Sequence, residues 1–206
     1  MSEGVLIAVS GFSGAGKGTI MKRLMEKYPG YALSVSATTR DPRPGEREGI
    51  EYFFKSEAEF DRMIENNELL EYAGYVGHYY GTPKHYVEEM RKNGKNVILE
   101  IEVQGALKVK EANPDTVMIF VAAPSLGEIE HRLNVRGTES KETIADRMSQ
   151  VKREIKSVEK YDYLVINEEI DKSVDLINSI VEAERTRVKN KKDFINRLSE
   201  EINGGK

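Results

Sequence analysis

The sequence predicts an α/β fold in which helices cover both faces of a parallel β-sheet core and one subdomain is inserted into the core. Short runs rich in Val, Ile and Leu alternate with longer helical patterns, and such alternation is typical of parallel sheets. A glycine-rich segment joins the first apolar run to the first helical pattern. Residues 38–81 interrupt the alternation, because they are rich in Tyr, Arg and Gly.

The core strands are expected where a short apolar run ends at glycine or polar residues. These runs are residues 5–10, 33–37, 97–102, 116–123 and 163–167. Helical spacing of apolar residues predicts helices between the runs. The helices are expected at residues 17–28, 83–92, 103–112, 126–135, 141–160 and from 171 onward. Ser56-x-x-Glu59 and Ser125-x-x-Glu128 are candidate capping boxes at two helix starts.

Two segments are expected to lie outside the regular alternation. Residues 38–81 contain the short apolar segments 51–54 and 69–80, which predict strands around one helix in an inserted subdomain. Residues 134–140 form a polar loop between two helices and suggest a second insertion. Residues 184–206 are highly charged and predict a solvated helix that frays at its terminal glycines.

Length and composition restrict the class of protein. The chain has 206 residues, enough for one compact domain or at most two small ones, and its net charge of −4 predicts no general affinity for nucleic acid. It contains no cysteine, which excludes disulfides and thiolate metal sites. No apolar run approaches the roughly 20 residues that cross a bilayer. The first residues lack the basic start of a signal peptide. We therefore expect a cytosolic protein without a membrane partner, and we infer no obligate protein partner.

The glycine-rich segment after the first strand has the pattern of a phosphate-binding loop (P-loop), which predicts the P-loop NTPase fold. Its glycines let successive backbone N–H groups point into one hollow, the next helix adds its positive N-terminus, and the lysine adds a full charge. The candidate ATP-binding residues are Gly11, Phe12, Ser13, Gly14, Ala15, Gly16, Lys17, Gly18 and Thr19. Gly18 stands where a magnesium-binding Ser or Thr is usual. The alternative, a tight turn with a surface lysine, is disfavoured by the strand–loop–helix context.

A second cluster of polar residues lies in the predicted insertion. Arg40 and Arg43 are three residues apart in a Pro- and Gly-rich segment, and Tyr52 follows them. Two guanidinium groups and a phenol make a good clamp for a phosphate group. Further along, Glu71 and the run Tyr79-Tyr80-Gly81-Thr82 add a carboxylate, a phenol and a hydroxyl. Singly, each of these residues could serve as a packed aromatic, a solvated carboxylate or a surface ion pair.

The segment Ser36-x-Thr38-Thr39-Arg40-x-Pro-Arg43-x-Gly45-Glu46, followed by Tyr79-Tyr80-Gly81, resembles guanylate kinase, and the match extends from Gly11 to Asn167. The resemblance implies that the phosphate of GMP is held by Arg40, Arg43, Tyr52 and Tyr80. It implies that guanine is recognised by Ser36, Glu71, Thr82 and Glu102. Glu102 stands where aspartate is common in the family, and Thr82 where serine is also common.

The chemistry of guanine supports this assignment independently. Guanine presents N1–H and the N2 amino group as adjacent donors, and O6 as an acceptor. A carboxylate such as Glu71 can accept from both donors, and a hydroxyl such as Thr82 can donate to O6. Adenine would face that carboxylate with an unprotonated N1, which leaves a buried charge unpaired. A hydrogen-bonding site of this kind discriminates by about 10⁴-fold or more.

Phosphoryl transfer to a phosphate oxygen requires no general base, because the second pKa of a phosphate ester is about 6. Catalysis is therefore expected from alignment and charge neutralisation. The candidate catalytic residues are Lys17, Arg40, Arg132, Arg136 and Arg147. The resemblance places the last three in a helical lid over ATP, with Arg136 beside the adenine and Asn167 near the adenine or ribose. Exposed charged helices are the alternative for these arginines.

Mg²⁺ is the expected cofactor, bound together with ATP, and the resemblance implies that phosphates and water hold most of it. Glu100 and Glu102 end the predicted strand 97–102. Glu100 is a candidate contact to Mg²⁺ through water, since hard carboxylates suit this ion. Alternatively, Glu100 anchors a lysine or an arginine.

The resemblance describes residues 1–206 as one guanylate-kinase domain with four regions. Residues 1–35 and 83–125 form the core, 36–82 the GMP-binding insertion, 126–150 the lid, and 151–206 the remaining core with the C-terminal helix. The expected activity is ATP-dependent phosphorylation of GMP, and of dGMP, in nucleotide metabolism. The alternatives are a kinase for another monophosphate, a non-catalytic guanylate-kinase-like interaction domain, and a P-loop GTPase. The GTPase would need Asn-Lys-x-Asp after a buried strand, but 190–193 lies in the charged C-terminal segment.

Overall fold

The computed structural model describes residues 3–75, 77–135 and 141–204. The main sheet is formed by β1 (Leu6–Gly11), β2 (Tyr31–Leu33), β7 (Asn96–Glu100), β8 (Val117–Ala122) and β9 (Tyr163–Ile166). The strand order is β2-β7-β1-β8-β9, and every pair is parallel. The predicted parallel core is therefore confirmed. Strand β1 lies at its centre, and ligands of such sheets bind at the carboxyl ends of the strands.

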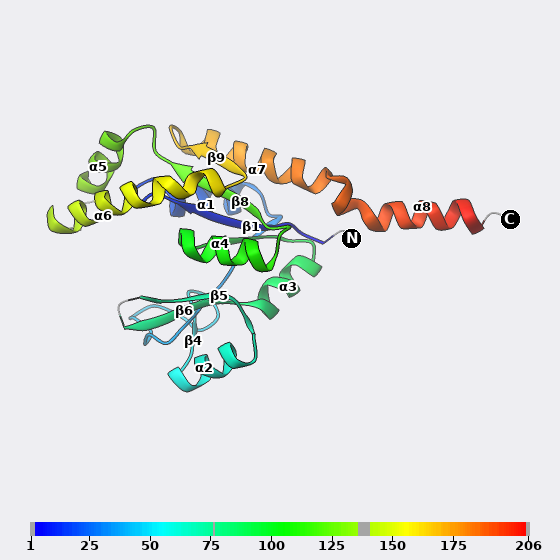
Figure 1. The fold of residues 1–206 in the computed structure, drawn as a ribbon, viewed down its shortest axis with the longest axis horizontal. Helices are drawn as coiled ribbons and strands as arrows, with labels where there is room; N and C mark the ends of the chain where they lie inside the picture. Colours follow the sequence, from blue (N-terminus) through cyan, green and yellow to red (C-terminus); the bar gives the residue numbers. More distant parts are fainter. Residues whose placement is uncertain (1–2, 76, 136–140, 205–206) are drawn as a thin grey trace.

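Helices cover both faces of this sheet, as the sequence predicts (Figure 1). They are α1 (Lys17–Lys27) and α7 (Ile170–Thr186) on one face, and α3 (Lys84–Lys92) and α4 (Val103–Ala112) on the other. Alternate residues of a strand point to opposite faces. Accordingly, Ile7 and Val9 of β1 lie in one buried cluster with apolar residues of α1 and α7. Leu6 lies in a second cluster with apolar residues of α3 and α4. Burial on both faces explains why the strand is a continuous apolar run.

A second, smaller sheet is inserted in the chain between β2 and α3. It contains β3 (Ala37–Thr38), β4 (Phe53–Phe54), β5 (Leu69–Tyr75) and β6 (His78–Pro83), in the order β4-β3-β6-β5. Helix α2 (Glu57–Glu65) belongs to the same insertion. Its predicted capping box is confirmed, because Ser56 Oγ accepts from the Glu59 N–H at 3.3 Å and Glu59 Oε2 accepts from the Ser56 N–H at 2.8 Å.

The prediction of one strand at residues 33–37 is wrong. Strand β2 ends at Leu33 in the main sheet, and Ala37 begins β3 in the second sheet. The Ser34 N–H donates to Ile98 O at 2.8 Å, whereas Ser36 O accepts from the Phe53 N–H at 2.8 Å. Neighbouring residues thus hydrogen-bond to different sheets, so the chain crosses from one to the other within this segment.

Strand β7 also ends earlier than predicted, at Glu100. Glu102 is the N-cap residue of α4, and its carbonyl accepts from the Ala106 N–H at 3.0 Å. The prediction that Glu102 ends a strand is therefore wrong. The apolar run continues through Ile101, but its backbone already turns into the helix.

Two further helices, α5 (Leu126–Val135) and α6 (Lys141–Glu154), lie at the end of the main sheet opposite to the chain termini (Figure 1). Helix α5 has the predicted bounds. The predicted helix 141–160 is α-helical to Glu154 and continues as the 3₁₀ helix η1 (Ile155–Lys160). Ser125 Oγ accepts from the Glu128 N–H at 3.1 Å, but the Glu128 side chain pairs with Arg132, so only half of this capping box forms.

The C-terminal segment is helical, as predicted, but it is divided. Helix α7 ends at Thr186, the 3₁₀ helix η2 (Val188–Lys191) follows, and α8 (Lys192–Gly204) extends away from the body of the molecule (Figure 1). Among the described residues, no helix combines the length and the hydropathy that crossing a membrane requires.

Candidate active site

The glycine-rich loop lies at the carboxyl end of β1, and its glycines are required by its geometry. Gly14 and Gly16 have φ angles of 81° and 93°, in the left-handed region that side chains disfavour. A Cβ added to Gly16 would lie 2.6 Å from Nδ2 of Asn167, and one added to Gly11 would lie 2.1 Å from the carbonyl oxygen of Val121. The backbone of the loop therefore packs too closely on its neighbours for any side chain at these positions. Phe12 is buried against Phe120, with ring centroids 4.8 Å apart.

Lys17 begins α1, and its ammonium group lies at the loop. Nζ donates to Gly11 O at 2.6 Å and to Phe12 O at 3.3 Å. Thr19 is exposed in the first turn of this helix. Gly18 faces the end of β7, because a Cβ added there would lie 4.0 Å from Oε1 of Glu100. Burial raises the pKa of the Glu100 carboxyl, while the charge of Lys17 opposes the increase and that of Glu102 adds to it.

Asn167 directly follows β9, and its side chain also holds the phosphate-binding loop in place. It is buried, and its Nδ2 donates to Ala15 O at 2.7 Å. Its Oδ1 accepts from Ser173 Oγ of α7 at 3.1 Å. The side chain thus fixes the loop to the first turn of α7, a role that its position after a strand does not disclose.

Arginines from α5 and α6 reach the same loop. Arg132 donates to Ala15 O at 3.4 Å and to Asn167 O at 3.1 Å, while its Nε donates to Glu128 Oε1 at 2.7 Å. Arg147 donates to Ser13 Oγ. Both arginines are therefore brought to the loop. Arg136 lies outside the described residues.

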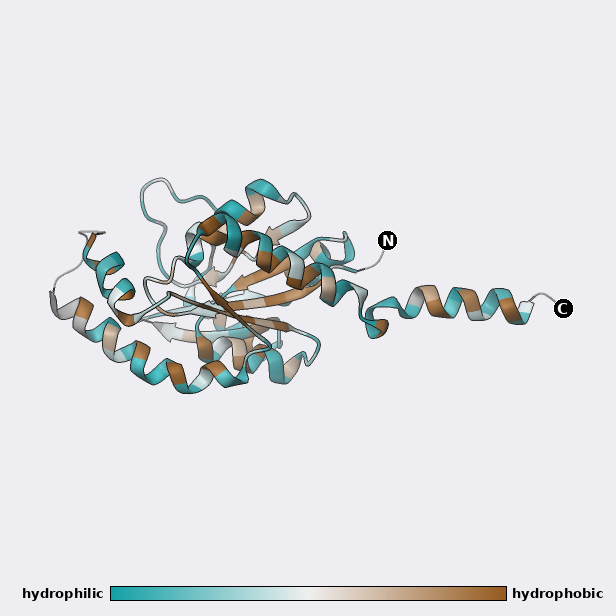
Figure 2. Cartoon of the chain, turned by 90° about the horizontal axis from the view of Figure 1, so that it is seen from above, coloured by the Kyte–Doolittle hydropathy of each residue, from teal (hydrophilic) through white to brown (hydrophobic). Residues whose placement is uncertain are grey.

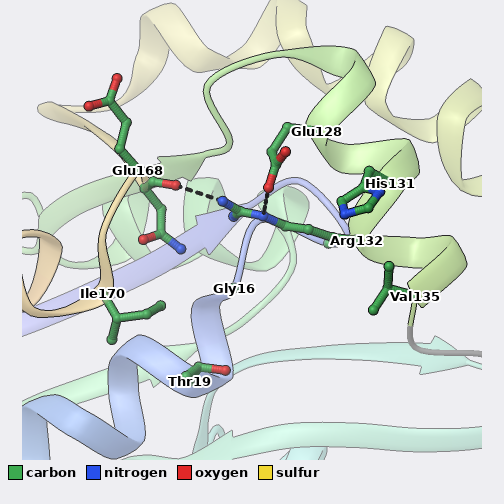
Figure 3. Close-up of a pocket in the computed structure, with 10 residues that line it drawn as sticks. Gly16, Thr19, Glu128, His131, Arg132, Val135, Glu168 and Ile170 are labelled. Atoms are coloured by element: carbon green, nitrogen blue, oxygen red, sulfur yellow. Dashed lines mark hydrogen bonds and ion pairs between the residues drawn. The ribbon is translucent and has the colours of Figure 1, made fainter.

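A cavity of about 400 Å³ opens between the loop, α5 and the start of α7 (Figure 3). Its polar wall contains Thr19, Arg132 and Asn167, and its apolar wall contains Val135 and Ile170. Pockets of this volume with apolar walls and a few polar groups are typical of small-ligand sites. His131 and Glu168 also line the cavity, and the sequence analysis missed them. They carry no motif, so only the packing of α5 against the loop reveals them.

The phosphate clamp predicted in the insertion is partly assembled. Arg40 donates through NH2 to both carboxylate oxygens of Glu46, at 2.9 Å each, and its guanidinium lies 5.4 Å from the Tyr52 ring centroid. The rings of Tyr52 and Tyr80 are 5.9 Å apart. Arg43 is exposed, and its backbone N–H donates to Glu46 Oε2 at 2.8 Å. Glu46, which the sequence analysis did not place in the site, therefore orients the clamp.

The two adjacent tyrosines separate by strand alternation on β6. Tyr79 stacks on Phe60 of α2 at a centroid distance of 5.5 Å, whereas Tyr80 faces Tyr52. Of the two tyrosines, Tyr80 therefore lies beside Tyr52 of the predicted clamp, and Tyr79 packs on α2. Ser36 is half-buried at the crossing between the sheets.

The predicted guanine-recognising pair is assembled on the hairpin of β5 and β6. Thr82 Oγ1 donates to Glu71 Oε1 at 2.8 Å, and both residues are buried, Glu71 being 9% exposed. Burial raises the pKa of the Glu71 carboxyl, while the Thr82 hydrogen bond opposes the increase. A Cβ added to Gly105 of α4 would lie 3.0 Å from Glu71 Oε2, so this glycine makes room for the carboxylate. Glu102 is exposed three residues earlier on the same helix face.

One further carboxylate near the loop was not predicted. Glu154, the last residue of α6, accepts from Gln150 Nε2 at 2.8 Å. Burial raises the pKa of its carboxyl, and the nearby charge of Glu102 adds to the increase. Glu100, Glu102 and Glu154 thus lie close enough to influence one another's charge, and the charge of Lys17 acts on Glu100 and Glu154.

Comparisons with known proteins identify the family. The guanylate kinase family model matches residues 3–184, so α8 lies beyond the matched segment. The chain is 51% identical over 199 residues to a guanylate kinase of Caldanaerobacter subterraneus, with 97% of both chains covered. It is 51% identical over 190 residues to one of Desulfitobacterium hafniense, covering 92% of this chain and 95% of that protein. The crystal structure of guanylate kinase from Anaplasma phagocytophilum superposes with a TM-score of 0.71 at 34% identity, covering 91% of this chain and 89% of that one.

These matches span both groups of polar residues described above. One group lies at the carboxyl ends of β1 and β7, and the other lies in the inserted sheet. On both grounds, this chain belongs to the guanylate kinase family.

Proposed function

We propose that this protein transfers the γ-phosphoryl group of ATP to the phosphate of GMP, yielding ADP and GDP. The observation that carries the proposal is the buried pair of Glu71 and Thr82 beside the Arg40 clamp, facing a core that holds a phosphate-binding loop. A phosphate oxygen of GMP bonds to the γ-phosphorus of ATP, and the bond from that phosphorus to the oxygen bridging the β- and γ-phosphates breaks. The electron pair leaves with ADP.

The acceptor is held at both ends. Glu71 accepts from N1–H and the N2 amino group of guanine, and Thr82 donates to O6 when GMP replaces its contact with Glu71. Arg40, Tyr52 and Tyr80 bind the phosphate, with Arg43 approaching from the surface. Ser36 and Glu102 complete the base site. Adenine offers no hydrogen-bond donor where guanine presents N1–H and its N2 amino group. The buried carboxylate of Glu71 would then stay unpaired, which is strongly disfavoured.

The donor is held by the loop residues 11–19. Lys17 moves from the carbonyl groups of the loop to the β- and γ-phosphates, and the N-terminus of α1 adds positive potential. Arg132 and Arg147 neutralise charge that spreads over the transferred group, and Arg136 is assigned the same role from the family pattern. Asn167 borders the adenosine half of the cavity. These residues bind and align the substrates, so no side chain needs to remove a proton.

Mg²⁺ accompanies ATP in this proposal. Whether the ion fits depends on Gly18 and Glu100. A Cβ added to Gly18 would lie 4.0 Å from Glu100 Oε1, so the carboxylate borders the space that a Ser or Thr side chain would fill there. A carboxylate there can hold a hydrated Mg²⁺ through water. When bound, the ion neutralises charge on the β- and γ-phosphates. Lys17 would contact the phosphates directly, and Glu100 would hold the ion through water.

The test is ADP release from purified protein with ATP and Mg²⁺, coupled to NADH oxidation, with GMP, dGMP, AMP, CMP or UMP as acceptor. We expect activity with GMP and dGMP at least 100-fold above that with the other monophosphates. The Lys17→Ala variant, purified in parallel, controls for contaminating kinases and should lose the activity. Absence of GMP-dependent ADP release would overturn the proposal and favour a non-catalytic interaction domain.

A further inference from the structure

Two helices of this chain begin with the motif Ser-x-x-Glu, and the two glutamates make different contacts. In α2, Glu59 turns back to the start of its own helix, where Oε2 accepts from the Ser56 N–H at 2.8 Å. This is the contact that completes a capping box. In α5, Glu128 Oε1 instead accepts from Nε of Arg132 at 2.7 Å. The Glu128 side chain therefore serves a contact other than the capping of its helix.

Arg132 contacts three groups, each through a different nitrogen of its guanidinium group. Nε donates to Glu128, and NH2 donates to Asn167 O at 3.1 Å (Figure 3). NH1 donates to Ala15 O of the phosphate-binding loop at 3.4 Å. Because the guanidinium group is planar and rigid, a contact that fixes Nε–H also fixes the directions of NH1 and NH2. Glu128 thus controls how the terminal nitrogens face the loop.

We infer that Glu128 is a positioning residue, which holds Nε of Arg132 so that NH1 and NH2 point at the phosphates of ATP. The inference rests on the proposed function, because that function assigns Arg132 to the transferred phosphoryl group. NH1 and NH2 carry four of the five N–H groups of an arginine. The carbonyl groups of Ala15 and Asn167 accept from two of these four. Phosphate oxygens can accept from the others while Glu128 keeps its own contact with Nε.

Helix α5 places this ion pair at the edge of its buried face. Hydrophilic and hydrophobic residues alternate along the helices farthest from the C-terminus (Figure 2). In α5, Ile129 and Leu133 are each 1% exposed, and Glu128 and Arg132 precede them by one position. The side chains of the pair are 37% and 25% exposed, in that order. Both residues also line the nucleotide cavity, so the pair is shielded by the core and still open to a ligand.

The expected effect of this ion pair is on orientation. Ion pairs at exposed sites add little to stability. Glu128 precedes Arg132 by four residues, the arrangement that favours pairing on a helix. Without the carboxylate, the long arginine side chain would have to be ordered again in each turnover. A displacement of about 1 Å can lower an enzymatic rate about 100-fold, and the two remaining carbonyl contacts should limit the loss to less than that.

Other roles for Glu128 would change different quantities. If its carboxylate only neutralised Arg132, removing it would strengthen the attraction of this arginine for ATP, and kcat would rise or KM for ATP would fall. If Glu128 only stabilised α5, removing it would lower Tm and leave kcat unchanged. A positioning role instead lowers kcat and leaves the wild-type KM for GMP, because the GMP site lies in the inserted sheet.

Initial rates of ADP release from the full-length protein test the inference. Glu128→Ala should lower kcat about tenfold, within the range that a misplaced group can cause. Glu128→Gln keeps an oxygen that can accept from Nε–H and should recover most of the lost kcat. Glu130→Ala removes the same charge from an exposed position on another face of α5 and is the matched control, which should behave as wild type. An unchanged or increased kcat of Glu128→Ala would overturn the inference.

A double-mutant cycle tests whether Glu128 acts through Arg132. Arg132→Ala lowers kcat by itself, and adding Glu128→Ala should cause no further loss, because no guanidinium group is left to orient. An equal loss in both backgrounds would show that Glu128 acts independently and would overturn the inference. The wild type tests the proposed function separately. A wild type without GMP-dependent ADP release refutes that function together with the inference, whereas an active wild type and an equally active Glu128→Ala variant refute the inference alone.

Discussion

Replacing Glu71 by Gln tests the guanine site directly, because it removes one charge and changes the shape of the side chain little. The carboxylate accepts from two guanine donors in the proposed complex, and each charge-assisted hydrogen bond contributes about 1.5–3 kcal/mol. The amide keeps one acceptor but presents an NH₂ group to the second donor. Loss of one to two bonds is about 1.5–6 kcal/mol, and each tenfold change is about 1.4 kcal/mol. We expect kcat/KM for GMP to fall by about 10- to 10⁴-fold.

The measurement is initial-rate ADP release over a range of GMP concentrations at saturating ATP and Mg²⁺. The KM for ATP should change little, since Glu71 belongs to the inserted sheet and not to the loop. Glu65→Gln, in the exposed last turn of α2, is the matched control and should behave as wild type. A Glu71→Gln enzyme with the wild-type kcat/KM for GMP would refute the role of this carboxylate.

The same variant has an expected effect on stability. Burial raises the folded-state pKa of Glu71, so the stability that this group contributes is present below its unfolded pKa of about 4.3. That contribution is lost as pH rises through the folded-state pKa. Gln does not titrate, so the difference in unfolding free energy, Glu71→Gln minus wild type, should grow from pH 4 upward and then level off. Urea titrations at several pH values measure it. A difference independent of pH would contradict this account.

Three other changes test the packing around the site. Gly105→Ala places a Cβ 3.0 Å from Glu71 Oε2 and should raise KM for GMP about tenfold, whereas Gly127→Ala, whose Cβ meets nothing within 3.8 Å, should not. Glu46→Gln removes the ion pair that orients Arg40 and should raise KM for GMP by about 3- to 10-fold, with Glu51→Gln at an exposed pair as the control. Asn167→Ala removes two buried hydrogen bonds and should lower stability by about 2 kcal/mol, or Tm by about 4–8 °C. Unchanged melting of Asn167→Ala would show that the loop does not need this anchor.

Local signals explain the parts of the fold that the sequence predicts well. Helix α5 has the predicted bounds because an N-capping serine precedes its apolar repeat, and α4 has them because its repeat is short and uninterrupted. The phosphate loop is equally local, since its glycines, its lysine and the flanking strand are contiguous. The position of each loop residue therefore follows from the chain order alone.

The features that the sequence does not predict depend on contacts between segments far apart in the chain. Residues 33–37 look like one strand in the sequence, and only the hydrogen bonds of Ser34 and Ser36 to different sheets reveal the break. The contact of Gly105 with Glu71 joins segments far apart in the chain, so no spacing predicts it. Glu46 was visible in the family pattern, but its ion pair with Arg40 requires the folded loop. Glu102 appeared to continue an apolar strand, and only the backbone turn after Glu100 makes it a helix cap.

The crossing between the two sheets has a mechanical consequence. Where the chain leaves the main sheet, Val35 is the single residue between Ser34, whose amide is bonded to the main sheet, and Ser36, whose carbonyl is bonded to the small sheet. Where the chain returns to the core, Pro83 ends β6 and Lys84 begins α3, with no residue between them. Two such short connections limit how far the small sheet can move along the main sheet, because neither contains residues that could extend. Because Glu71 lies on the small sheet and Gly105 lies on α4 of the core, the contact between them joins the two parts of the molecule beside the proposed guanine site.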